Sequence, residues 1–278
     1  MPHRHDIDVR LRSLQDIGKI MRSMKNLSYL ETRKLGRFLD SQRQVVAGIE
    51  AAAHDLLIHH PDLLSEAPDG GTVLVLIGAE RGFCGNFNEA IREALERRTA
   101  APEPTAEVSL ITVGTRLGPL LETDSRVVER IPGATAAEEV PSVLSRLVPV
   151  LGHLTEERGG QAVRVLHWDS ETEQVETTPL LPPFGDLRDD AKPEQAYPAR
   201  LNLDPKAFLA ALIEHYLFAI LHALLFGSLM AEHLQRVRHL EGALQRVDSR
   251  VNELKQRRNL LRQEEITEEI ELILLNRA

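Results

Sequence analysis

The C-terminal part of the chain carries apolar residues at a regular helical spacing. No proline follows Pro205. From Met230 onward an apolar stripe steps by four and three, through Met230, Leu234, Val237, Leu244, Val247, Val251, Leu254 and Leu261. Two positions of this stripe are charged, Glu241 and Arg258. Heptad spacing is typical of a helix wound around a partner. A continuous helix over residues 206–278 would be about 110 Å long. We therefore expect a second helix beside it.

The N-terminal segment supplies a matching helix. Residues 4–60 contain no proline and carry an apolar stripe that also steps by about four and three, at Ile7, Leu11, Leu14, Ile17, Met21, Met24 and Leu27. Two terminal helices with similar stripes, separated by a long insert, indicate an antiparallel pair. The sequence thus predicts a coiled coil made from both ends of the chain.

The insert between these helices alternates short, continuous apolar runs with helical patterns. We expect buried strands at 72–78, 108–113, 126–131 and 162–168, helices at 89–98, 116–121 and 136–157, and an antiparallel edge strand at 171–178. Breaks rich in proline, glycine or charge lie at 65–71, 101–104 and 181–204. Strands that alternate with helices predict a mostly parallel sheet with right-handed crossovers.

The predicted fold class is α+β, with a long antiparallel coiled coil of the N- and C-terminal helices and an inserted Rossmann-like α/β domain. The expected divisions are an N-terminal helix at 1–60, the α/β insert at 70–205 and a C-terminal helix at 206–278. The base of that last helix is expected to pack on the insert. Its residues 208–230 are apolar nearly all round but contain Glu214 and two histidines. The longest uncharged run, Tyr216–Met230, is too short for a hydrocarbon core of about 30 Å. A buried core helix is therefore favoured over a membrane span.

Composition narrows the possible partners and compartment. The formal net charge is -9 and aromatic residues make up 4% of the chain, so general binding to nucleic acid is not expected. The N-terminus is charged and lacks a following apolar run, which indicates no signal peptide. Cys84 is the single cysteine and cannot form an internal disulfide. These features predict a reducing, cytoplasmic setting.

The loop Gly78–Asn88 is the first candidate for chemistry, because it lies between a predicted strand and a predicted helix, where α/β proteins bind phosphates. Its glycines, at 78, 82 and 85, match neither the dinucleotide nor the P-loop spacing, and the loop has no lysine. A nucleotide site and a tight turn both remain open. The turn, in which Gly82 and Gly85 allow positive φ and close helix packing, is favoured.

Cys84 also has two interpretations. It could be a nucleophile with His167 or Asp169 as its partner, or a buried and inert thiol, which is the usual state of a lone cysteine in an apolar turn. None of the eleven histidines lies at a convincing metal-ligand spacing. We therefore expect no catalytic residue, no cofactor and no metal.

Two polar segments could bind a partner. Lys19, Arg22 and Lys25 form a basic stripe on the first helix, which is either a solvated face or a surface for an acidic partner. A charged collar at 262–269 precedes an apolar ending at Ile270–Leu275. A seam that becomes charged and then apolar again is unusual in a free coiled coil, and it suggests successive bands of contact with something that surrounds the helix.

Four segments together resemble the gamma subunit of rotary F-type ATP synthases. Ile7–Lys25 resembles the N-terminal helix of that family, Glu80–Asn88 its strand-end loop, Ser228–Val237 the start of its rotor helix and Arg262–Ile270 its Arg-Gln-x-x-Ile-Thr-x-Glu segment. The resemblance covers nearly the whole chain. The sequence departs from the usual pattern at Leu240, Arg246, Leu272 and Asn276.

The resemblance implies a non-catalytic shaft inside a hexamer of alternating alpha and beta subunits. An epsilon-type subunit and the membrane c ring would be further partners, at the cytoplasmic face of the cell membrane, where the complex couples ion transport to ATP synthesis or hydrolysis. It also implies a catch on a beta subunit formed by Arg262, Gln263, Thr267 and Glu269, and an apolar bearing formed by Met21, Met24, Ile270, Ile273 and Leu274. The alternatives are an α/β enzyme that uses the Gly78–Asn88 loop and a generic coiled-coil scaffold.

Overall fold

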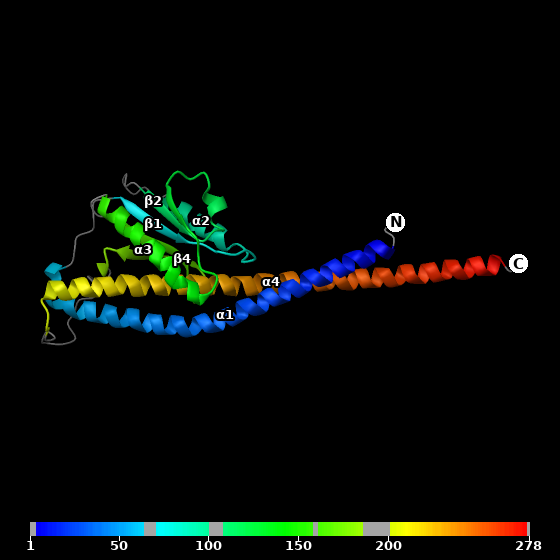
Figure 1. Cartoon of the computed structure of the whole chain (residues 1–278), viewed down its shortest axis with the longest axis horizontal. Coiled ribbons are helices and arrows are strands. Elements are labelled where there is room, and N and C mark those ends of the chain that lie inside the picture. The colour runs from blue at the N-terminus through cyan, green and yellow to red at the C-terminus, as the bar shows by residue number, and fades with distance from the viewer. Residues whose placement is uncertain (1–3, 64–70, 100–107, 158–160, 186–200, 277–278) are drawn as a thin grey trace. The chain divides into compact units, whose positions relative to one another are not determined.

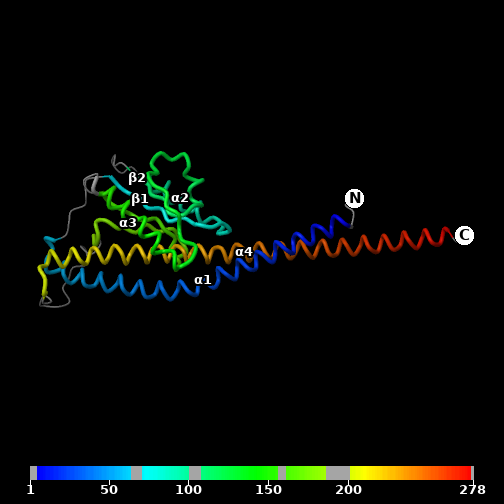
Figure 2. Tube along the Cα trace, viewed as in Figure 1, coloured from blue at the N-terminus to red at the C-terminus, as the bar shows by residue number. Residues whose placement is uncertain are grey.

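The computed structural model describes residues 4–63, 71–99, 108–157, 161–185 and 201–276. The predicted breaks at 65–71, 101–104 and 181–204 lie largely outside these ranges. The chain forms two compact units, one made of Met1–Tyr29 with Arg236–Ala278 and the other of Leu30–Gln235. The long terminal helices α1 (Arg4–His59) and α4 (Pro205–Leu275) each contribute to both units, and both can be followed in Figure 2.

The larger unit is built on a five-stranded sheet in the order β3-β2-β1-β4-β5. The strands are β1 (Thr72–Ile77), β2 (Val108–Val113), β3 (Val127–Ile131), β4 (Ala162–Trp168) and β5 (Val175–Leu181). The first four run parallel, whereas β5 pairs antiparallel with β4. The predicted mostly parallel sheet with an antiparallel edge is confirmed.

The antiparallel edge strand lies later in the sequence than predicted. Residues 171–178 were expected to be extended, but β5 occupies Val175–Leu181. A turn takes up the intervening residues, since Asp169 Oδ1 accepts the amides of Glu171 and Thr172 at 2.6 and 2.9 Å, and Glu173 has a φ of 55°. An aspartate that accepts nearby amides and a residue with positive φ are typical of turns. Asp169 and Glu173 therefore make β5 begin later in the sequence than predicted.

Two of the shorter helices were predicted with approximately correct ends but with starts two to four residues away from those observed. α2 is Phe87–Thr99 and α3 is Val140–Glu157, with Pro149 inside it. A 3-10 turn at Ala137–Glu139 precedes α3. The helix expected at 116–121 is reduced to a 3-10 turn, Gly118–Leu121, with a proline in its first turn. Another 3-10 turn, Pro61–Leu63, follows α1.

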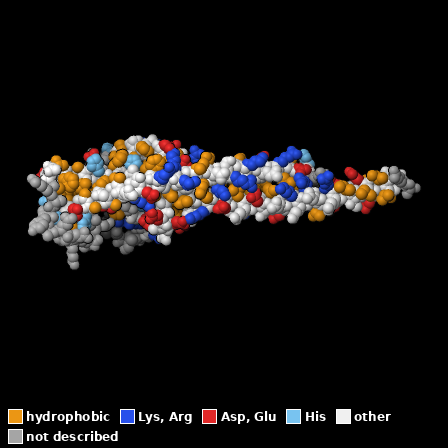
Figure 3. All heavy atoms as spheres, turned by 90° about the horizontal axis from the view of Figure 1, so that it is seen from below, with side chains coloured by type: hydrophobic (Ala, Val, Ile, Leu, Met, Phe, Trp, Pro, Cys, Tyr) orange, Lys and Arg blue, Asp and Glu red, His pale blue; other side chains and the backbone are white. Residues whose placement is uncertain are grey.

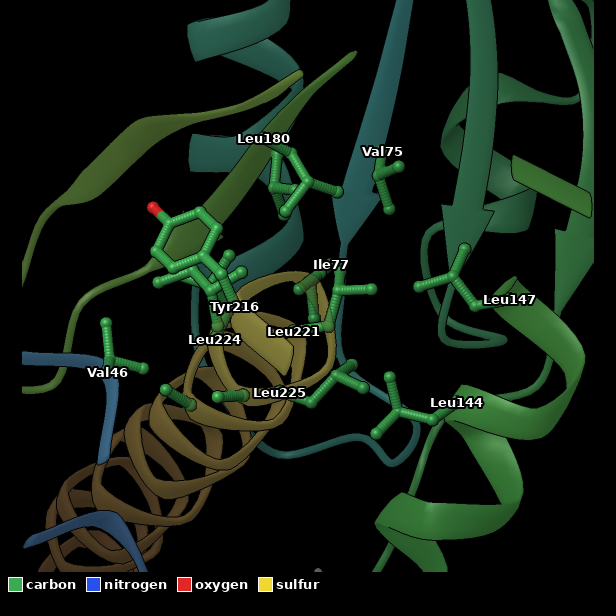
Figure 4. Packing of buried hydrophobic residues seen from close by; sticks show 14 of the residues in the cluster. Val46, Val75, Ile77, Leu144, Leu147, Leu180, Tyr216, Leu221, Leu224 and Leu225 are labelled. Carbon is green, nitrogen blue, oxygen red and sulfur yellow. The ribbon is translucent and has the colours of Figure 1, made fainter. Parts of the chain in front are cut away.

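The sheet of the larger unit is covered on both faces (Figure 1). One face carries Val73, Val75 and Ile77, which pack in the same core cluster as α3 and the nearby parts of α1 and α4. The opposite face carries Leu74 and Leu76, which pack with α2. Figure 4 shows the first of these cores, with residues of α3, α4 and β1 converging on one another. Burial on both faces explains why the parallel strands are almost continuously apolar.

The apolar segment of α4 serves this core. By length and composition α4 is apolar enough to cross a membrane, but residues 219–229 are all buried. Leu221, Leu224 and Leu225 are among those that pack in the cluster with the sheet and α3. The expectation of a buried core helix is therefore met over residues 219–229, whereas Glu214, His215 and Phe218 in the first part of the predicted segment are exposed.

The smaller unit is an antiparallel coiled coil. Asp8 lies 3.6 Å from Arg258, and Arg22 lies 2.7 Å from Asp248. Residue numbers therefore increase along one helix as they decrease along the other, which is the antiparallel arrangement. Two apolar clusters form its seam: Ile7 and Leu11 with Val251 and Leu254, and Met21 with Leu240 and Leu244.

The seam of α1 differs from the predicted stripe. Ile17 and Leu27 are 45% and 64% exposed, whereas Gly18 is buried, with Val247 close to where its Cβ would lie. Steps of four and three from Ile7 lead through Leu11 and Leu14 to Gly18. The predicted stripe instead placed the larger residue Ile17 in the seam, one position away from this register. A small residue lets the two helices approach closely, and the buried positions follow the helical register rather than side-chain size.

Candidate functional site

The loop Gly78–Asn88 begins where the order of the parallel strands reverses. β1 lies between β2 and β4, and the chain moves outward through β2 and β3 before it returns to β4. Ligands of open α/β sheets bind at this switch point, beyond the carboxyl ends of the strands. The loop is therefore correctly placed for an anion or a nucleotide.

A side chain of the protein itself occupies the amides at this position. The carboxylate of Glu232, on α4, accepts the backbone N–H of Glu80 at 3.0 Å and that of Arg81 at 3.2 Å. Glu232 is 3% exposed. Asn88 Oδ1 accepts the N–H of Ala79 at 2.9 Å. Three consecutive amides that could bind a phosphate thus donate to internal oxygens.

Close packing leaves little room at the base of the loop. A Cβ on Gly78 would lie 2.8 Å from the Cβ of Leu117, and Gly114 (φ +103°) would place a Cβ 2.5 Å from the carbonyl oxygen of Gly78. Positive φ in the loop occurs at Phe83 and Gly85. The expectation of positive φ at Gly82 is therefore wrong, whereas that at Gly85 is correct. The tight-turn interpretation describes this loop.

We expect the purified chain neither to bind nor to hydrolyse ATP. The loop has no lysine, and its first amides are already hydrogen-bonded to Asn88 and Glu232. Isothermal titration calorimetry with Mg-ATP should show no binding heat. Micromolar affinity would contradict this reading of the loop.

Cys84 and His167 lie on opposite faces of the sheet. Cys84 is buried in the cluster around α2, and its thiol lies 3.6 Å from the carbonyl oxygen of Arg81. His167 alternates with Leu166 and Trp168 along β4, and it lines a cavity of about 180 Å³ together with residues of α1 and α4. A nucleophile–base pair cannot form across the sheet. Among the described residues, no group of three or more His, Cys, Asp or Glu side chains could hold a metal ion.

His167 should make the stability of the chain depend on pH. It is 4% exposed, and burial lowers its pKa below the ordinary 6.5, against the opposing influence of Asp169 and Glu176. The unfolded chain binds a proton near pH 6.5 whereas the folded chain resists it, so stability falls as the pH drops below about 6.5, by at most about 1.4 kcal/mol per unit. The free energy of unfolding can be measured with urea at pH 7.5 and at pH 5.5. Its decrease between the two pH values should be smaller for His167→Gln than for the unmodified chain. The exposed-site control His239→Gln should keep the full loss, and equal losses in all three would contradict the assignment.

The basic stripe lies on the coiled coil, and its three side chains form ion pairs within the chain. Arg22 donates to Asp248 at 2.7 Å, and Lys25 lies 3.5 Å from Glu241, both on α4. Lys19 pairs with Asp16 on its own helix at 2.9 Å. Arg22 and Lys25 thus pair with acidic residues of the other helix of the same unit. Charge pairs beside a seam set helix orientation and register.

The collar and the apolar ending lie on a stretch of α4 that α1 does not accompany. Because Asp8 is opposite Arg258, α1 starts at Arg4 near the level of residue 262. Every residue from 262 to 276 is exposed. Figure 3 shows apolar side chains gathered towards this end of the molecule. We call residues 262–275 the single-helix tip.

The predicted catch residues share the tip but occupy two sides of the helix. Arg262 and Glu269 are seven positions apart and lie on one side, whereas Gln263 and Thr267 are four apart and lie on another. The Thr267 hydroxyl donates to the carbonyl oxygen of Gln263 at 2.9 Å. The side chains of Arg262 and Gln263 are both available to a partner that surrounds the helix.

The predicted bearing residues are not all brought together. Ile270, Ile273 and Leu274 lie on the tip and are more than half exposed. Met21 and Met24 instead pack in the seam with Leu240 and Leu244, about 45 Å of helix from Ile270. The two methionines belong to the coiled coil rather than to the surface of the tip.

Sequence reasoning missed Glu232 as a contact residue. Its signal was present, since a carboxylate directly after the long apolar run of a core helix must find donors. Glu80 was also missed. Its carboxylate accepts the amides of Thr115 and Gly133, at 3.0 and 2.7 Å, and so joins the ends of β2 and β3 to the loop after β1.

Comparison with known proteins identifies the family. The family model described as ATP synthase matches residues 3–274. The ATP synthase gamma chain of Caldanaerobacter subterraneus subsp. tengcongensis is 24% identical, over 96% of each chain. That of Streptococcus mutans is 26% identical, over 95% of this chain and 94% of its own.

Solved structures share the fold. A chain in the structure of the Euglena gracilis mitochondrial ATP synthase rotor superposes with a TM-score of 0.63 at 15% identity, covering 95% of this chain and 98% of its own. A chain in the Tetrahymena thermophila mitochondrial ATP synthase central stalk and c ring gives a TM-score of 0.57 at 16% identity, over 81% and 99%.

The family match, the long antiparallel coil and the α/β sheet whose ligand position is filled by Glu232 together indicate a stalk subunit. The chain belongs to the ATP synthase gamma chain family. It is the non-catalytic central stalk of a rotary, membrane-associated ATP synthase complex.

Proposed function

We propose that this chain turns as the shaft within a hexamer of alternating alpha and beta subunits, with an epsilon-type subunit and the membrane c ring as further partners. The observation that carries the proposal is the single-helix tip, whose residues 262–275 are all exposed although five of the last six residues of α4 are apolar. An exposed apolar end of this kind marks a contact surface. The related structures are those of a rotor, of an F1 with c ring and of a central stalk with c ring.

The shaft acts through its asymmetry. A partly coiled pair of helices presents different side chains in different directions, so rotation offers each catalytic site of the hexamer a different surface in turn. Each surface favours the open or closed state of the site that it meets. The complex would lie at the cytoplasmic face of the cell membrane, with this chain as a peripheral component.

The catch is assigned to the charged part of the tip. Arg262, Gln263, Thr267 and Glu269 would form directional hydrogen bonds with a beta-type subunit at one angle of rotation. All four side chains are exposed, which leaves the charges of Arg262 and Glu269 accessible for such contacts. These bonds would break and re-form as the shaft turns.

The bearing is assigned to Ile270, Ile273 and Leu274, with the seam methionines Met21 and Met24 stiffening the coil below. Apolar contacts are non-directional. A tip surrounded by an apolar collar could therefore rotate without losing fixed hydrogen bonds at each step. The bearing would support the assembly rather than trigger catalysis.

Changes at the tip test this assignment. We expect deletion of residues 274–278 to leave a working complex that is less stable to heat, because burial contributes about 25 cal/mol per Å² whatever the orientation. Leu274→Asp should impair assembly more than the deletion, because it places a charge in an apolar collar. Assembly yield and ATPase activity measure the two effects separately. Loss of catalysis in fully assembled deletion complexes would show that the tip is a specific trigger.

A further inference from the structure

The contact between α4 and the end of β1 contains two polar groups on one side of the helix. Ser228 and Glu232 are four residues apart and therefore lie on the same face of α4. The Ser228 hydroxyl lies 3.5 Å from the carbonyl oxygen of Ile77, the last residue of β1. One turn further along, Glu232 accepts the amides of Glu80 and Arg81 with separate carboxylate oxygens.

The same contact continues into the rest of the sheet. The side chain of Glu80 accepts the amides of Thr115, after β2, and of Gly133, after β3. The Thr115 hydroxyl also donates to the carbonyl oxygen of Glu80 at 3.0 Å. A chain of hydrogen bonds thus runs from α4 through Glu80 to the carboxyl ends of three parallel strands.

The surrounding contacts are of a different kind. Most of the face of α4 that packs on the sheet is aliphatic, with Leu221, Leu224, Leu225 and Leu229 in the core. Aliphatic packing holds a helix against a sheet but has no preferred direction. Hydrogen bonds weaken steeply when their angle changes, and those to a carboxylate are stronger than neutral ones. The paired bonds of Glu232 add a directional contact to this apolar packing, and rotation of α4 about its own axis would break them.

We propose that Glu232 is a positioning residue that fixes the rotational setting of α4 on the α/β layer, so that torque passes between the shaft helix and this layer without slipping. The inference rests on the proposed function as a rotating shaft. In α/β folds of this kind a bound anion often lies beyond the carboxyl ends of the strands. Here the Glu232 carboxylate occupies that position, and the proposal gives it a mechanical role.

Two measurements on Glu232→Gln separate this role from simple stabilisation. Glutamine keeps the size of the side chain and one acceptor oxygen, but its amide group opposes the second backbone N–H. Hydrogen exchange of the Glu80 and Arg81 amides in the full chain should accelerate about tenfold or more in the variant, because a charge-assisted bond is lost. In the whole complex in membrane vesicles, the ratio of ATP-driven ion pumping to ATP hydrolysis should fall about twofold or more, because slippage separates the two.

The matched control is Glu214→Gln, an exposed glutamate on the same helix, which should change neither measurement. Unchanged exchange at Glu80 and Arg81 would show that Glu232 does not hold the loop and would overturn the proposal. Faster exchange with an unchanged pumping ratio would reduce Glu232 to a stabilising residue and would also overturn it. Absence of coupled pumping in the unmodified complex would instead contradict the shaft function. Glu232→Ala, if it assembles, should lower the ratio further than Glu232→Gln, and an equal or higher ratio would count against a positioning role.

Discussion

Leu240→Ala is expected to lower the free energy of unfolding of the coiled coil by about 2–5 kcal/mol, the usual cost of truncating a buried leucine and leaving a cavity. Leu240 is 0% exposed and packs with Met21 and Leu244, where the two helices meet. Few other residues are available to fill the space, because the seam of a two-helix unit is narrow. Urea unfolding followed by circular dichroism measures the change.

The matched control is Leu260→Ala, on the same helix. Leu260 is 60% exposed, so its truncation should change the free energy of unfolding by no more than about 0.5 kcal/mol. Equal losses in the two variants would show that Leu240 does not lie in a packed seam. Leu240 is one of the departures from the usual family pattern, and its burial explains why an apolar residue serves there.

Joint replacement of Arg262 and Gln263 by alanine is expected to reduce ATP-driven ion pumping and turnover of the whole complex about tenfold or more. A hydrogen bond to a charged group contributes about 1.5–3 kcal/mol, and 1.4 kcal/mol is a tenfold change. Stability of the free chain should not change, because both side chains are exposed and belong to the tip. Pumping by inverted membrane vesicles, ATP hydrolysis and thermal melting of the chain test the three parts of this prediction.

The control for the double variant is Lys255→Ala with Gln256→Ala. These exposed residues lie seven positions earlier, so they occupy the same sides of α4 but at a level where α1 accompanies it. Pumping should be retained much better in the control. Unchanged pumping and turnover in the Arg262 and Gln263 variant would remove the catch assignment.

The fold was largely predictable because its signals are local and repetitive. Proline-free ends with heptad spacing indicated the two long helices, and all-apolar runs such as Thr72–Ile77 indicated strands covered on both faces. The errors came where one residue alters the register. Asp169 and Glu173 delayed the edge strand, and Gly18 took a seam position that had been given to Ile17.

The candidate site was less predictable, because its contacts join residues far apart in the sequence. The tip could be recognised from composition, and its exposure follows from the greater length of α4 beyond the start of α1. The bonds of Glu232 to the amides of Glu80 and Arg81 span about 150 residues. Spacing within one segment carries no information about such a pairing, which depends on how α4 meets the strand ends.

Direct observation of rotation tests the shaft function most directly. A hexamer of alpha and beta subunits would be fixed to a surface with this chain bound, and a bead attached to a cysteine introduced at Ser145, which is exposed on α3, whereas Cys84 is buried. On addition of ATP, the bead should turn continuously in one direction and should stop when ATP is removed. ATP hydrolysis by the same assembled complex, with the bead fluctuating but never turning in a fixed direction, would contradict the assignment of this chain as the rotating shaft.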